Sequence, residues 1–142
     1  MAEAAPGGDG VSLCLYAALG GALLGVVPGD AWELRWTHSV EKVEWREVWR
    51  QASGGLLRLD QAQVKGAGAG MEPGPDARLI DGWWTWAPDA PPLPAVTLAA
   101  SAYTAEHMIC AAVNASDGGD CRRLSQWAGG VADAALTLKV CS

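Results

Sequence analysis

The sequence predicts an all-β domain, a small antiparallel β-sandwich or partly open barrel of about eight to nine short strands. Three observations predict this class. Short apolar runs recur along the chain and each ends in a turn signal. Several runs alternate apolar and polar side chains, with the period of two that a half-buried strand has. The length of 142 residues suits one domain with its own core.

The first elements form a predicted hairpin. We expect residues 1–10 to be a flexible N-terminal segment and residues 11–142 to form a single β domain. Within that domain, residues 11–17 and 22–27 are apolar runs. Gly20-Gly21 between them suits a tight turn, because glycine adopts positive φ without strain. These observations predict two antiparallel strands at the start of the domain.

Residues 11–27 contain no charged side chain and are therefore the candidate for a signal peptide or a membrane-spanning segment. The ten residues before it carry acidic rather than basic side chains, which argues against a signal peptide. The run is short for a spanning helix and is interrupted by Gly20, Gly21 and Gly25. We therefore expect no transmembrane segment in this chain.

The next two strands carry four of the eight tryptophans. A strand over residues 31–40 places four side chains on one face: Trp32, Leu34, Trp36 and His38. Residues 41–44 form a turn or bulge, and a strand over residues 45–52 places Trp45, Glu47 and Trp49 on one face. A helix over residues 41–51 is the alternative, but its tryptophans would not form a clean apolar stripe.

The rest of the chain contains further short strands separated by irregular loops. The loops are rich in glycine and proline and cover residues 66–75 and 88–94. The predicted strands cover residues 56–65, 78–86, 95–103, 107–113, 122–127 and 134–141.

Charge and composition exclude some partners. Only 18% of the residues are charged, and the formal net charge is -6. The sequence contains no basic run, so we expect no nucleic-acid partner, because phosphate contacts need clustered lysine and arginine. Eight tryptophans stand beside two tyrosines and no phenylalanine. They form either a tryptophan-rich core or a stacking surface for a ligand.

The four cysteines are compatible with two disulfides in an oxidising compartment. Cys110 and Cys121 flank a turn-like segment and would face each other on paired strands. Cys14 and Cys141 can pair if the first and last strands are neighbours. No C-x-x-C motif is present and there are only two histidines, so we expect no metal and no cofactor.

Three groups of residues are candidates for function. His38 and Glu47 would point to the same face of a hairpin, either as a ligand-contacting, proton-sensitive pair or as a hydrogen bond that fixes strand register. Ser39 follows His38 directly and would point to the other face. Trp83 and Trp84, with Trp86, could form a stacking platform. No nucleophile motif is present, so we expect a domain without catalytic residues.

The segment over residues 34–49 resembles a known family pattern. It contains His38-Ser39-Val40-Glu41-Lys42 and then Glu47, and a glycine-rich loop with Pro73 follows at residues 66–70. This pattern resembles the bacterial family called domain of unknown function 1850, and the resemblance extends over residues 13–140. Its loop carries an extra Gly-Ala step compared with the family pattern. Members are small proteins or fused domains encoded beside permeases of TRAP-type tripartite transporters, especially the TAXI type.

The resemblance implies a non-catalytic accessory or binding domain in the periplasm or another extracytoplasmic location. Its partner would be a TRAP-type permease, a solute receptor or a small organic solute. The candidate binding residues are His38, Ser39, Glu41, Lys42, Glu47, Trp83 and Trp84. Two alternatives remain open. One is a carbohydrate- or small-ligand-binding module with a tryptophan-rich surface, and the other is a hydrolase or metal-dependent enzyme centred on His38 and Glu47.

Overall fold

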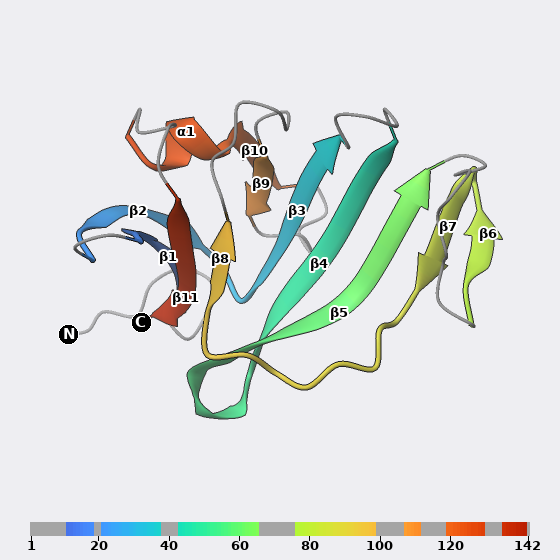
Figure 1. Cartoon of the computed structure of the whole chain (residues 1–142), viewed down its shortest axis with the longest axis horizontal. Coiled ribbons are helices and arrows are strands. Elements are labelled where there is room, and N and C mark those ends of the chain that lie inside the picture. The colour runs from blue at the N-terminus through green and yellow to red at the C-terminus, as the bar shows by residue number, and fades with distance from the viewer. Residues whose placement is uncertain are drawn as a thin grey trace.

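The structure is a computed structural model that describes most of the chain. The described residues are 11–18, 21–37, 43–65, 76–98, 107–111, 119–129 and 135–141. Within them the chain forms eleven strands in two antiparallel sheets, so the predicted sandwich is confirmed and the barrel alternative is not (Figure 1). The predicted strand number of eight to nine was too low. The predicted N-terminal segment, residues 1–10, lies outside the described residues.

The smaller sheet has four strands. They are β1 (Ser12–Ala17), β2 (Leu23–Pro28), β8 (Val96–Leu98) and β11 (Leu136–Cys141). Their order is β2-β1-β11-β8, so the first and last strands of the chain are hydrogen-bonded neighbours. The predicted hairpin is confirmed as β1–β2, which contains a register shift after Leu15.

The larger sheet has seven strands in the order β10-β9-β3-β4-β5-β7-β6. Their bounds are β3 (Ala31–Thr37), β4 (Glu44–Ala52), β5 (Leu56–Lys65), β6 (Arg78–Ile80), β7 (Trp83–Trp86), β9 (Met108–Ala111) and β10 (Asp120–Arg123). The 3₁₀ turn η1 (Ser53–Gly55) joins β4 to β5 and contains two glycines with positive φ. The segment over residues 45–52 is therefore a strand, and the helix alternative is wrong for it.

Two sequence predictions need correction here. The segment over residues 78–86 is a hairpin rather than one strand, because Asp81 and Gly82 both have positive φ, at 51° and 86°. Two positive-φ residues form the tight turn that suits paired strands. The segment over residues 122–127 ends β10 and then forms the helix α1 (Leu124–Trp127), whose Leu124 and Trp127 are buried.

The core lies between the two sheets. It is formed by apolar side chains from β1, β2, β3, β5, β9, α1 and β11, including Leu15, Val27, Trp32, Leu57 and Ile109. A cavity of about 10 Å³ between the sheets is lined almost entirely by these apolar residues. It is too small for an organic ligand.

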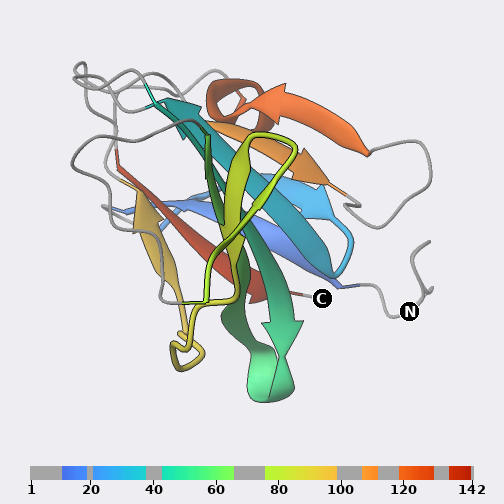
Figure 2. The same cartoon turned by 90° about the vertical axis from the view of Figure 1, so that its right-hand side faces the viewer.

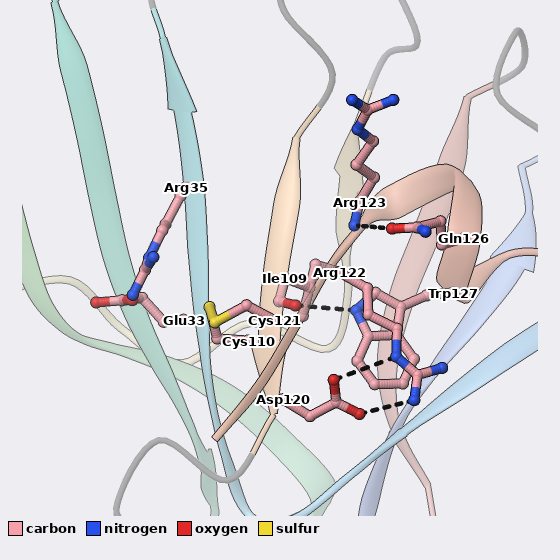
Figure 3. Close-up of a disulfide and its surroundings, with 10 residues drawn as sticks. All are labelled: Glu33, Arg35, Ile109, Cys110, Asp120, Cys121, Arg122, Arg123, Gln126 and Trp127. Atoms are coloured by element: carbon pink, nitrogen blue, oxygen red, sulfur yellow. Dashed lines mark hydrogen bonds and ion pairs between the residues drawn. A yellow bond between two sulfur atoms is a disulfide. The ribbon is translucent and has the colours of Figure 1, made fainter. Parts of the chain in front are cut away.

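Both predicted disulfides are present. Cys14–Cys141 connects β1 to β11, and Cys110–Cys121 connects β9 to β10. The second bond lies at one end of the large sheet, beside Glu33 of the neighbouring strand β3 (Figure 3). On the other side of β9, the Trp127 indole donates to the carbonyl oxygen of Ile109 at 2.9 Å. These links fix β10 and α1 to the sheet.

Candidate functional site

The large sheet extends beyond the small one. In Figure 1, the end with β7 and β6 projects past the four strands of the small sheet, and Figure 2 looks onto that end. We call the side facing the small sheet the inner face and the opposite side the outer face. Strand register places Trp32, Leu34 and Trp36 of β3 on the inner face, where the first two join the core. The candidate site lies on the inner face, from β3 and the start of β9 across to the projecting strand β7.

An unbroken run of rings crosses this part of the inner face. His107 lies against Trp36, with ring centroids 5.4 Å apart. Trp36 stacks on Trp45 of β4 at 5.9 Å, with their planes 5° apart, and Trp45 meets the edge of Trp86 of β7 at 6.3 Å. We call these four residues the aromatic face. All four are half-buried, so part of each ring reaches the surface.

Strand pairing explains why these rings meet. Trp36 lies directly opposite Trp45 in the β3–β4 ladder. Trp86 lies opposite Ala62 of β5, and Ala62 in turn lies opposite Glu47 of β4. The small side chain of Ala62, only 3% exposed, therefore lies between a carboxyl group and an indole ring. Small residues on a strand leave room for larger neighbours to meet above them.

Glu47 is the acidic group of this region. Its carboxylate accepts a hydrogen bond from the Trp49 indole at 3.0 Å. Burial raises the pKa of Glu47 above its usual value of 4.5, and the hydrogen bond from Trp49 opposes that shift. The carboxyl group is thus biased toward its neutral form, which can donate as well as accept a hydrogen bond.

His107 is the basic group of the region. Burial lowers the pKa of His107 from its usual 6.5, so the neutral imidazole is favoured. A neutral imidazole offers one donor and one acceptor nitrogen. The aromatic face therefore combines three indole rings with an imidazole that favours its neutral form, and it is suited to a flat ring or an apolar group with a few polar atoms.

The sequence-predicted candidates divide into three sets. His38, Ser39, Glu41 and Lys42 lie outside the described residues, so the predicted His38–Glu47 pair stays a prediction. Glu47 is on the inner face as expected, where it lies opposite Leu34. Trp83 and Trp84 point to opposite faces of β7 and form no common platform, whereas Trp84 and Trp86 share the inner face.

His107, Trp36 and Trp45 were not among the binding candidates predicted from the sequence. Alternation already placed Trp36 and Trp45 on Trp-bearing strand faces, so their pairing could have been anticipated once the strands were paired. His107 carries no local signal. It reaches Trp36 because β9 pairs with β3, from which it is far removed in sequence.

Neither a metal-binding cluster nor a membrane-spanning helix is found among the described residues. Among the described residues, no group of three or more histidine, cysteine, aspartate or glutamate side chains could hold a metal ion. In the same part of the chain, no helix has the length and apolar character needed to span a membrane.

Comparison with known proteins assigns the family. No curated protein and no solved structure matches the chain. A family profile matches more than half of the chain, from Trp32 at the start of β3 to a position beyond β9. The match includes every residue of the aromatic face and is narrower than the range suggested by the sequence resemblance. The chain belongs to the family described as Domain of unknown function (DUF1850), whose profile matches residues 32–116.

Proposed function

We propose that this protein is a non-catalytic binding domain that works outside the cytoplasm and binds through its aromatic face. One observation carries the proposal. Four rings lie in continuous contact on the inner face of the large sheet and stay half-buried, although burying such rings fully is favourable. Partly exposed aromatic clusters are typical of ligand and partner sites.

The proposed location rests on the cysteines. Among the described residues, all four cysteines are in disulfides. Disulfides persist in oxidising compartments and are rare where thiols are kept reduced. The proposed system, a TRAP-type transporter of the TAXI type, rests on the resemblance of the segment over residues 34–49 to its family pattern. The bound species would be a small organic solute or a component of that system.

The proposal is tested by calorimetric titration with a panel of organic acids and sugars. It is also tested by pull-down with the permease and the solute receptor of a TRAP-type transporter. We expect at least one ligand of the panel to bind about tenfold or more weakly to Trp86→Ala, because stacking on an indole ring is lost. Ile80→Ala is the matched control, because it removes an exposed apolar side chain from the outer face of the adjacent strand.

The outcomes separate the candidates. Binding of sugars alone would favour the carbohydrate-binding alternative over a transport role. Binding that is reduced equally by Trp86→Ala and Ile80→Ala would exclude the aromatic face as the site. Capture of the permease or receptor by the wild-type protein, and its loss in Trp86→Ala, is the result expected for a transport accessory domain.

A further inference from the structure

The outer face of the large sheet gathers positive charge in a chain whose net charge is -6. Strand register and alternation place six of the ten basic residues there: Arg35, Arg46, Arg50, Arg58, Lys65 and Arg78. Three of the six form ion pairs with two carboxylates of the same sheet. Arg35 pairs with Glu33 at 2.6 Å, and Asp60 pairs with Arg50 at 3.0 Å and with Arg58 at 3.7 Å.

Arg46 and Lys65 differ from these three arginines. Within the described part of the chain neither forms an ion pair. Both instead lie against one indole ring, because the Arg46 guanidinium carbon is 4.2 Å and the Lys65 Nζ is 5.4 Å from the centre of the Trp83 ring. Two like charges are thus held beside one ring, an arrangement that a bound anion would stabilise.

The Arg46 side chain is fixed in place yet not fully satisfied. Its Nε is shielded from solvent and has no hydrogen-bond acceptor among the described residues. A guanidinium that packs on a ring keeps its N–H donors in its own plane, where they match the two oxygens of a carboxylate. Unsatisfied buried donors are rare in native proteins and call for a partner.

The neighbours of Arg46 do not supply that partner. Arg35 and Gln63 lie directly opposite it on the two adjacent strands. Gln63 donates its amide to the Thr85 hydroxyl at 3.1 Å, and Thr85 donates to the carbonyl oxygen of Trp83. Glu44, two residues before Arg46 on the same strand, is exposed and forms no ion pair within the described residues.

We propose that Arg46, Lys65 and Trp83 form a binding site for a carboxylate group, carried by a small organic acid or by an acidic peptide segment. The choice of a carboxylate rests on the planar Arg46 guanidinium, which is held against the Trp83 ring and whose N–H donors match the two oxygens of a carboxylate. The site lies on the opposite side of the sheet from the aromatic face and does not depend on its function.

The experiment is an NMR titration of the whole protein with three probes: succinate, hexaglutamate and inorganic phosphate. The observed signals are the Trp83 indole N–H and the Arg46 Nε–H. We expect saturable shifts of both with at least one carboxylate probe, and none with dimethyl succinate, which has the same skeleton without charge. Shifts with succinate would mean that a small organic acid is enough to occupy the site. Shifts with hexaglutamate alone would mean that the carboxylate is carried by an acidic peptide segment.

Variants locate the effect. Arg46→Met keeps the aliphatic stem and should weaken carboxylate binding about tenfold or more. Arg50→Met, on the same strand and face but paired with Asp60, is the matched control and should leave affinity unchanged. Lys65→Met provides a second variant if Arg46→Met does not fold. Equal loss in Arg46→Met and Arg50→Met, binding of phosphate alone, or no shift with any probe would overturn the proposal.

Discussion

Trp32 donates its indole N–H to the carbonyl oxygen of Val27 at 3.1 Å, and Trp127 donates to Ile109 at 2.9 Å. Both side chains are at least nine-tenths buried, so their polar atoms need these partners. Trp36, Trp45 and Trp86 are half-buried and contact one another instead. The composition was compatible with either a tryptophan-rich core or a tryptophan-rich surface, and the structure contains both.

The raised pKa of Glu47 leads to a prediction about how the stability of the fold depends on pH. Because burial raises its pKa in the folded state above 4.5, the folded protein binds the proton more tightly than the unfolded chain. Its stabilising contribution is present below pH 4.5 and is lost as pH rises through the folded-state pKa. We expect Glu47→Gln, which keeps an acceptor for Trp49, to gain stability relative to wild type over that interval.

The measurement is chemical unfolding of both proteins between about pH 4 and pH 8. His107 acts in the opposite direction, because its lowered pKa makes its contribution present above pH 6.5 and lost as pH falls. It is common to both proteins and cancels in the difference. Glu44→Gln removes an exposed glutamate from the same strand and serves as control. A flat difference for Glu47→Gln would contradict the prediction.

The short helix α1 has an effect beyond its four residues. It brings Trp127 over β9 and its last turn against β2. A Cβ atom added to Gly25 of β2 would overlap the carbonyl group of Trp127. Only glycine fits at this close approach of two backbones.

We expect Gly25→Ala to lower the free energy of unfolding by about 3 kcal/mol, because backbone rather than a flexible side chain must move. Gly21→Ala is the matched comparison. Gly21 has φ of 69° and no atom near the added Cβ, so its substitution costs only backbone strain, about 1 kcal/mol. Denaturant unfolding measures both. Equal losses would show that α1 yields freely and that the contact does not constrain β2.

At the scale of single elements, the alternation of apolar and polar side chains predicted the long strands better than the short ones. The strands β3, β4 and β5 begin within one residue of the expected positions, because Pro28-Gly29 precedes β3, tryptophans recur along β4 and Gly54-Gly55 precedes β5. The β6–β7 hairpin was missed because two short apolar strands flank a two-residue turn and resemble one run. The helix α1 was missed because four residues cannot display a helical period.

The whole molecule explains why the two surfaces were hard to predict. No run of basic residues is visible in the sequence. The basic residues of the outer face lie on different strands, and within a strand they are separated by residues that point to the inner face. Pairing of five strands, β3, β4, β5, β7 and β6, then gathers them on one face. His107 reaches the aromatic face through the same kind of long-range pairing. The disulfide between Cys110 and Cys121 was easier to predict from the sequence, because its two cysteines are close in the chain.

The two disulfides differ in the length of chain they enclose. Cys14–Cys141 spans 127 positions and Cys110–Cys121 spans 11. A longer loop removes more entropy from the unfolded chain, which gives about 5 kcal/mol for the first bond and about 3 kcal/mol for the second. We expect the double variant Cys14→Ala/Cys141→Ala to lose about 2 kcal/mol more stability than Cys110→Ala/Cys121→Ala.

Denaturant unfolding under oxidising conditions measures this difference. With a reductant added, the wild type should lose stability as well and the gap between the two variants should narrow. A larger loss for Cys110→Ala/Cys121→Ala under oxidising conditions would mean that local packing around the short loop, rather than chain entropy, governs the contribution of these bonds.

The bond between the first and last strands also has a mechanical consequence. Its two Cα atoms are 5.9 Å apart. Tension applied to segments attached before β1 and after β11 therefore passes through a covalent link, and the sheets between carry little of the load. Once that link is reduced, the same tension can extend the chain between the two cysteines by roughly 400 Å. Where such segments are pulled, the redox state of one bond decides whether the domain is a short rigid joint or a long extensible tether.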